Sequence, residues 1–315
     1  MIKFFYFEFK FILRDIYHFF SNDYKIPISN LFNFLPYQRL RMFIDDFFTK
    51  KFQSKFQNEK WYSDATNSGI TVHENVYKKE EINYIKNLSE NLIMDYKNHS
   101  IIYYDANKLK NKINKYSVYA DYYRLPLYDK GNNTQMVSNF YHFFFSNKYL
   151  LTQLCFFSGY KCSVENISID ICKVKGELNT DDWHSDCFSH TAKAFFYLND
   201  VEADNSPFCF LVGSHTNGKL KKDIEIENSK KTSINFHKAN KKISADDIWN
   251  RLKDSKSSNK IFSFYENKEC IYNSNTMIVA DTSGFHRKGY SSGKKERFMV
   301  CISANRGNLL KKISF

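Results

Sequence analysis

Short apolar segments separated by turn residues dominate the C-terminal half of the chain. They are rich in β-branched and aromatic residues and span 163–174, 193–201, 208–215, 275–284 and 296–304. Several short strands of this kind, each ending at a turn, are typical of an all-β barrel or jelly roll. The hydrophobic pattern therefore predicts that this half of the chain is mainly β.

A helical signal precedes the β region. Residues 79–97 repeat apolar side chains at helical spacing, which predicts an amphipathic helix directly after a short strand at 69–76. The aromatic run at 141–145 is expected to be buried. We assign residues 63–315 to one domain, mainly β with flanking helices.

The first 62 residues differ in composition from the rest. Residues 1–62 contain no glycine and place many phenylalanines among charged residues at mixed spacing. This predicts a helical N-terminal extension with breaks at Pro27 and Pro36. Two roles stay open for its aromatic side chains. They pack on the core of the main domain, or they contact a membrane surface peripherally, where basic residues beside Phe are favourable.

A highly charged insertion interrupts the predicted strands at 219–260. It contains 12 Lys or Arg and 6 Asp or Glu, so it carries half of the net charge of the chain, which is +12. Dense charge with few apolar positions predicts a solvated segment. A lid over a binding site is the functional alternative.

Composition narrows the class of protein. The chain has 315 residues, of which 43% are hydrophobic and 18% aromatic, so it can bury a sizeable core. The basic residues are scattered, which argues against a nucleic-acid partner. Seven cysteines without a C-x-x-C pair argue against a disulfide framework and favour a reducing, cytoplasmic location. No apolar stretch is long enough to predict a transmembrane helix, and none has the form of a cleavable signal.

His184 and Asp186 form an H-x-D motif shortly before the segment 193–201. Residues i and i+2 of a strand point to the same face, so both side chains can reach one metal ion. A third ligand should come from another strand, and His286 follows the segment 275–284. Two histidines and one carboxylate make the facial triad of non-haem Fe(II) oxygenases, which leaves open positions for a co-substrate and oxygen.

Arg297 makes this interpretation more specific. It lies eleven residues after His286, at the start of the predicted strand 296–304. A planar guanidinium can bind a carboxylate through two hydrogen bonds. In a jelly roll, this position lets Arg297 face the pocket floor and bind the distal carboxylate of 2-oxoglutarate. H-x-D alone is a weak signal, but a distal His and an Arg in strand contexts strengthen it.

The arrangement resembles the phytanoyl-CoA dioxygenase family of Fe(II)/2-oxoglutarate-dependent oxygenases. The resemblance rests on WHSD at 183–186, KAFFYLNDVEADNSPFCFLVGSHTNG at 193–218, ADTSGFHRKG at 280–289 and KERFMV at 295–300. It covers about residues 69–310 and implies a double-stranded β-helix, a jelly roll of the cupin-like type.

The resemblance also implies a site and a reaction. His184, Asp186 and His286 would bind Fe(II), and Arg297 would bind 2-oxoglutarate, with O2 as the second co-substrate and succinate and CO2 as products. Related halogenases replace the carboxylate ligand with a small residue. The presence of Asp186 therefore predicts hydroxylation of a small-molecule or acyl substrate.

Two features of the family do not transfer directly. Members often carry a small hydroxyl residue two positions after the distal histidine, and this chain has Lys288 there. The aromatic side chain that often flanks the co-substrate corresponds to Phe195 or Phe196, and the sequence does not separate the two.

Other residues near these motifs have simpler interpretations. GSHTNGK at 213–219 matches part of a phosphate-binding loop, but Leu220 stands where such a loop needs Ser or Thr. We expect a turn there, with His215 in a structural hydrogen bond. His190 is expected beside the metal site or on the surface, and Lys193 either adds charge to the pocket or is exposed.

Two other classes of function stay open. The chain could be a non-catalytic jelly-roll protein whose aromatic N-terminus binds a lipid or an acidic partner. It could also be a zinc or other metal hydrolase that uses the same three ligands. Arg297 favours the oxygenase, because neither alternative needs it.

Overall fold

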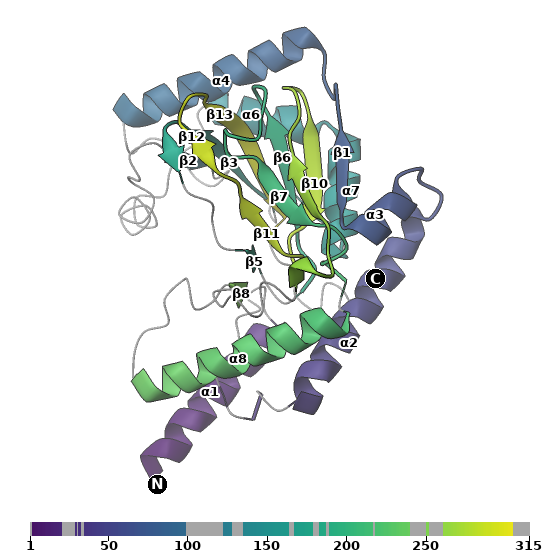
Figure 1. The fold of residues 1–315 in the computed structure, drawn as a ribbon, viewed down its shortest axis with the longest axis vertical. Coiled ribbons are helices and arrows are strands. Elements are labelled where there is room, and N and C mark those ends of the chain that lie inside the picture. Colours follow the sequence, from purple (N-terminus) through teal and green to yellow (C-terminus); the bar gives the residue numbers. More distant parts are fainter. Residues whose placement is uncertain are drawn as a thin grey trace.

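Two antiparallel β-sheets form the centre of the molecule (Figure 1). They are described by a computed structural model. The structure describes residues 2–20, 29, 31–32, 35–98, 122–127, 135–163, 167–178, 183–186, 189–216, 218–239, 250–251 and 261–304.

The larger sheet has six strands in the order β1-β10-β6-β13-β3-β2, and all neighbours are antiparallel. Strands far apart in the sequence lie side by side, as in a jelly roll. The strands are β1 Ile70–His73, β2 Tyr122–Leu127, β3 Ile167–Val174, β6 Ala192–Tyr197, β10 Met277–Asp281 and β13 Arg297–Ala304.

The smaller sheet has the order β8-β5-β11-β7-β9. Its strands are β5 His184–Ser185, β7 Phe208–Leu211, β8 Asn250–Arg251, β9 Asn267–Cys270 and β11 His286–Lys288. A separate pair joins β4 Glu177–Leu178 to β12 Ser291–Ser292. The two facing sheets confirm the predicted double-stranded β-helix with flanking helices.

Helices pack on the sheets in two groups (Figure 1). In one group, α6 and α7 lie on the outer face of the larger sheet and α4 packs against α6. The other, α1, α2 and α8, lies at the end of the molecule near β5 and β8. The helices are α1 Ile2–Phe20, α2 Leu35–Gln53, η1 Ser54–Phe56, α3 Tyr62–Ser68, α4 Lys79–Asn98, α6 Gln135–Phe145, α7 Lys148–Ser158 and α8 Lys219–Ala239.

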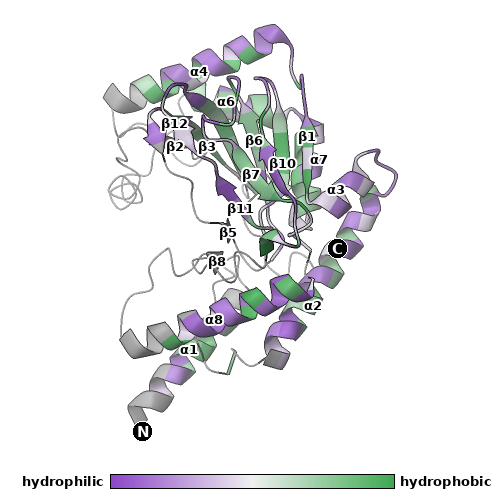
Figure 2. Cartoon of the chain, in the orientation of Figure 1, coloured by the Kyte–Doolittle hydropathy of each residue, from purple (hydrophilic) through white to green (hydrophobic). Residues whose placement is uncertain are grey.

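The larger sheet separates two apolar clusters, because side chains alternate between its faces. On β6, Phe196 faces the helices, and its ring centroid lies 5.7 Å from that of Phe144. Phe195 faces the space between the sheets, 4.2 Å from the ring of Phe208. Hydrophobic residues therefore dominate β6, β7 and β10 (Figure 2). Of the two candidates left open above, Phe195 lies on the side of the metal-ligand candidates.

Most predicted elements are present. Each segment predicted as a strand contains one, and the helix predicted at 79–97 is α4. The aromatic run 141–145 ends α6, where Tyr141 and Phe144 are buried. Pro36 is the second residue of α2, a first-turn position that needs no backbone N–H, so it stands at the start of a helix.

The first part of the charged insertion differs from expectation. Residues 219–239 form α8, and its N-terminal half packs against the protein, with Ile224 and Ile226 buried. Lys221 is fully buried, and its Nζ donates to the carbonyl of His215 at 3.1 Å. The prediction of a solvated segment is therefore wrong for this part of the insertion, because the buried ammonium of Lys221 has hydrogen-bond partners. Most of residues 240–260 lie outside the described part of the chain.

No helix among the described residues is long and apolar enough to cross a membrane. The six cysteines described, all but Cys187, are free thiols.

Candidate metal centre

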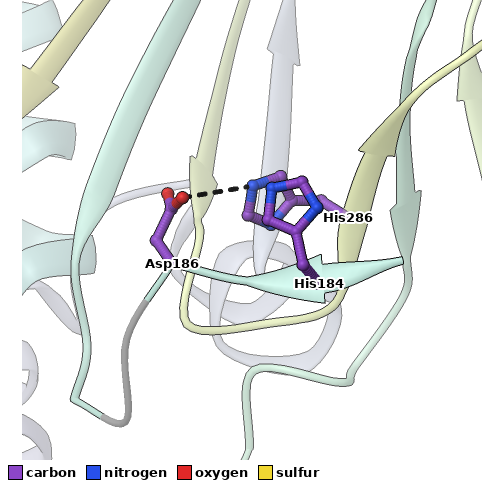
Figure 3. Close-up of side chains that lie close together, drawn as sticks. All are labelled: His184, Asp186 and His286. Carbon is purple, nitrogen blue, oxygen red and sulfur yellow. Dashed lines mark ion pairs between the residues drawn. The ribbon is translucent and has the colours of Figure 1, made fainter. Parts of the chain in front are cut away.

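His184, Asp186 and His286 meet beside the smaller sheet (Figure 3). His184 begins β5 and is paired in register with His286, the first residue of β11. Asp186 directly follows β5. One ligand atom from each residue lies within 4.8 Å of the other two. The structure thus brings together all three residues that the sequence proposes as ligands.

Backbone hydrogen bonds hold the two ligand-bearing segments together. The N–H of Asp186 donates to the carbonyl of Thr282 at 2.9 Å, and the N–H of Thr282 donates to the carbonyl of Thr191 at 2.8 Å. Gly284 allows the turn before His286 to lie close to β7, because a Cβ there would stand 2.7 Å from the ring of Phe210. The ligand positions are therefore fixed by the fold itself.

The ring of His286 is oriented for metal binding. Its Nδ1 lies 3.0 Å from the carbonyl oxygen of Gly284, which can only accept, so Nδ1 carries the proton. Nε2 then offers its lone pair to the site, where it lies 3.7 Å from Oδ1 of Asp186. Burial lowers the pKa of His286 to about 3, so the ring is neutral, as a ligand must be.

Asp186 is held between the imidazoles and a lysine. Lys193 projects from β6, and its Nζ lies 2.7 Å from Oδ2 of Asp186. Burial raises the pKa of Asp186, but the Lys193 ammonium and the two imidazoles outweigh it and hold the pKa well below its usual range. The carboxylate is ionised, with Oδ1 toward the histidines and Oδ2 on Lys193. Of the two roles left open, Lys193 therefore adds charge to the site.

These three donors fit a divalent transition metal. Two imidazole nitrogens and one carboxylate oxygen from three positions form a compact set, with ring centroids of His184 and His286 4.5 Å apart. The same donor types occur in non-haem Fe(II) sites and in catalytic zinc sites. The three side chains therefore indicate a metal centre but do not distinguish iron from zinc. That distinction depends on neighbouring groups.

Arg297 is the first residue of β13 and is 2% exposed. One guanidinium N–H donates to the carbonyl of Ser206, while Nε has no hydrogen-bond partner in the described part of the chain. The adjacent carboxylate of Glu296 pairs instead with Lys173 at 3.0 Å. No carboxylate among the described residues forms an ion pair with Arg297. A buried guanidinium without a counter-ion is costly, so its surroundings suit an anionic ligand.

The sequence does not predict a buried pair formed by His190 and Asp281, and His190 is not on the surface, which was one of its two expected positions. Nδ1 of His190 forms a very short contact with Oδ2 of Asp281. Oδ1 of Asp281 accepts from the N–H groups of Thr191 (3.2 Å) and Ser283 (3.0 Å). This one carboxylate joins the segment after Asp186 to the segment before His286. An acid at the end of the otherwise apolar strand 277–281 is the only sequence signal for it.

Helices α2 and α8 complete this polar cluster. The N–H of His190 donates to Asp45 Oδ2 at 3.2 Å, and its Nε2 lies 3.3 Å from Asp46 Oδ1. From α8, Nζ of Lys221 lies 3.4 Å from Oγ of Ser283. Burial lowers the pKa of His190, but Asp281 and Asp46 outweigh it and raise the pKa to about 9. Helices α2 and α8 are thus tied to the loops that carry the candidate ligands.

His215 has the structural role that the sequence analysis assigns to it. Its Nε2 lies 3.1 Å from the carbonyl of Thr66, and burial lowers its pKa to about 4. It does not belong to the group of candidate metal ligands found among the described residues.

The fold is a double-stranded β-helix, and solved structures share it. EctD from S. alaskensis with bound Fe matches with a TM-score of 0.50 and 12% identity, over 78% of this chain and 76% of EctD. EctD with 2-oxoglutarate and 5-hydroxyectoine also matches with a TM-score of 0.50 and 12% identity, over 78% of this chain and 75% of EctD. At this identity, the likeness shows a shared fold.

The epimerase SnoN in complex with Fe3+, alpha ketoglutarate and nogalamycin RO matches with a TM-score of 0.47 and 9% identity, over 81% of this chain and 82% of SnoN. No protein-family model and no curated protein matches the chain by sequence.

Proposed function

We propose that this protein is an Fe(II)- and 2-oxoglutarate-dependent oxygenase similar to the phytanoyl-CoA dioxygenase family. The observation that carries the proposal is the convergence of His184, Asp186 and His286, with ligand atoms within 4.8 Å of one another, on a jelly-roll fold. The fold shared with EctD supports it, because EctD has been crystallised with Fe and with 2-oxoglutarate.

Each residue has a defined role in this proposal. His184, Asp186 and His286 hold Fe(II), and Lys193 keeps the second oxygen of Asp186 occupied, which favours ligation through Oδ1 alone. Arg297 binds the distal carboxylate of 2-oxoglutarate, which supplies the counter-ion that the described residues do not. When bound, Fe(II) couples reduction of O2 to oxidation of 2-oxoglutarate to succinate and CO2.

Hydroxylation of a small-molecule or acyl substrate is the reaction we propose, because a carboxylate fills the position that would otherwise be open to a halide. Residues between the sheets are mostly apolar, including Phe195 and Phe208, which suits an apolar group next to the site. The free thiols described are those expected of a protein that works in the cytoplasm.

The test is to measure 2-oxoglutarate turnover by the purified protein. With Fe(II), ascorbate and O2, the protein should convert 2-oxoglutarate to succinate, and Asp186→Ala should not. The matched control is Asp64→Ala, which removes an exposed carboxylate of α3. A zinc hydrolase would make no succinate and would retain its activity under nitrogen, and that result would overturn the proposal.

A further inference from the structure

The N-terminal helices expose large apolar side chains to solvent. On α2, Leu40, Phe43 and Phe47 are 55%, 63% and 53% exposed. The exposed set, here called the N-terminal apolar face, comprises Tyr6, Phe9, Leu13, Ile16 and Tyr17 of α1 with Leu40, Phe43 and Phe47 of α2.

On each helix the exposed apolar residues recur at helical spacing, so they lie along one side of it. On α2 they recur at i, i+3 and i+7, and the rings of Phe43 and Phe47 stack at 6.3 Å. The opposite side of α2 is already packed, since Met42 and Phe52 are buried. A row of exposed apolar side chains along one side of a helix marks an interaction surface.

On the same helices the acidic side chains are buried or half-buried, and the exposed charged side chains are basic. Asp15 and Asp45 are buried and accept hydrogen bonds from the N–H groups of Ser29 and His190, at 2.8 and 3.2 Å. Asp46 pairs with His190. Glu8 and Asp46, the other acidic residues of α1 and α2, are half-buried. The exposed charges of the two helices are basic: Lys10, Arg39, Lys50 and Lys51.

We propose that the N-terminal apolar face binds an anionic lipid membrane peripherally. Apolar side chains flanked by exposed basic residues suit the boundary between acyl chains and negatively charged headgroups. A second copy of the chain fits less well. Self-association through this face would bring Lys50 and Lys51 of two copies together, without an exposed acidic side chain of α1 or α2 to pair with them.

The N-terminal apolar face lies at the same end of the molecule as the candidate metal centre. Helices α1, α2 and α8 lie at the end of the molecule that carries β5, and β5 begins with His184 (Figure 1). Contact through α1 and α2 would hold this end of the protein near the membrane. Resting on the proposed function, this placement suits a substrate with an acyl chain drawn from the bilayer.

The experiment measures binding to vesicles without metal or 2-oxoglutarate, so its result does not depend on the proposed activity. The full chain is sedimented with vesicles of phosphatidylcholine alone and of phosphatidylcholine with about 30 mol% phosphatidylserine. Binding should be strong only to the second and should weaken as salt is raised, because surface charge attraction is screened.

Two pairs of variants separate the apolar and the charged contributions. Phe43→Ser with Phe47→Ser should weaken binding about tenfold or more. Lys50→Glu with Lys51→Glu should remove the preference for anionic vesicles, at roughly fivefold per lysine. The matched controls are Met94→Ser, which changes a 61% exposed apolar residue on α4, and Lys294→Glu, which changes an exposed lysine elsewhere. Both controls should bind like the wild type.

Because all four helix positions are exposed, their variants should unfold at the wild-type temperature. The proposal fails if the wild type does not sediment with anionic vesicles, or if the control variants lose as much binding as the helix variants. It also fails if the wild type is a dimer by sedimentation velocity that Phe43→Ser with Phe47→Ser converts to a monomer, since a second copy would then be the occupant.

Discussion

Arg297 offers a way to separate a ligand-binding guanidinium from a structural one. Its side chain is buried at the start of β13, with one N–H on the carbonyl of Ser206 and no ion pair to a described carboxylate. If Arg297 binds an anionic co-substrate, its replacement should weaken ligand binding and leave the stability of the fold unchanged. If Arg297 stabilises the fold, its replacement should lower the stability and leave ligand binding unchanged. Two variants, Arg297→Lys and Arg297→Met, test this.

The size of the expected effect follows from the hydrogen bonds at stake. A charged two-point contact between a guanidinium and a carboxylate is worth about 1.5–3 kcal/mol. Lysine keeps the charge but loses the fork, so Arg297→Lys should weaken 2-oxoglutarate binding about 10- to 100-fold. Arg297→Met removes the charge and should abolish detectable binding. It should leave the ligand-free protein about as stable as the wild type, because it replaces an unpaired buried charge with an apolar chain.

Calorimetry under nitrogen, with 2-oxoglutarate titrated into Mn(II)-loaded protein, measures the first effect. Thermal unfolding with and without 2-oxoglutarate measures the second. At a ligand concentration of 100 times Kd, the wild type should gain about 2.7 kcal/mol, and Arg297→Met should gain nothing. Arg39→Lys, on the exposed side of α2, is the matched control. Wild-type affinity in Arg297→Lys, or a ligand-free Arg297→Met protein several degrees less stable than the wild type, would refute the reasoning.

Three further outcomes are expected. His286→Ala or Asp186→Ala should abolish binding of one Mn(II) or Zn(II) per chain in calorimetry while circular dichroism stays unchanged, and stoichiometric binding by either variant would contradict the ligand set. Lys193→Met should weaken metal binding about tenfold, because Asp186 loses the group that orients it, with little change in unfolding temperature; equal affinity would show that Lys193 only fills space. The pKa of His190 is raised above its unfolded value of about 6.5 to about 9, so its ion pair stabilises the fold fully below pH 6.5 and is lost as pH rises through 9. In denaturant unfolding, the wild type should therefore be more stable than His190→Gln, and this difference in the free energy of unfolding should fall by up to about 3 kcal/mol between pH 6.5 and 9. The control His142→Gln, at an exposed position, should have the stability of the wild type at each pH. A difference for His190→Gln that does not change with pH would count against the ion pair.

The elements that the sequence predicts well are those whose signal is local. Nearly continuous apolar runs mark β3, β6, β10 and β13, because both faces of the larger sheet are covered. His184 begins β5 and Asp186 directly follows it, so the i, i+2 spacing of an extended chain accounts for their common direction. His286 and Arg297 were located by strand context and by a family resemblance rather than by spacing alone.

The parts that the sequence does not predict depend on partners far apart in the chain. Asp281 meets His190 across 91 residues, and Asp45 meets it across 145. The local sequence around Asp281, His190 or Asp45 does not show that its partner of opposite charge lies in another element. The same reason explains α8, where Lys221 is buried because the carbonyl of His215 and the hydroxyl of Ser283 lie within reach of its Nζ.

The hydrogen bonds between the segments that carry the three candidate ligands also bear on whether the fold needs the proposed metal. The bonds from Asp186 to Thr282 and from Thr282 to Thr191 use only backbone groups, and the contacts of Asp281 use only protein partners. None of them requires an ion, so we expect the chain to fold without metal. On the proposed function, a chain made while iron is scarce would reach its native state and take up the metal later, without new synthesis.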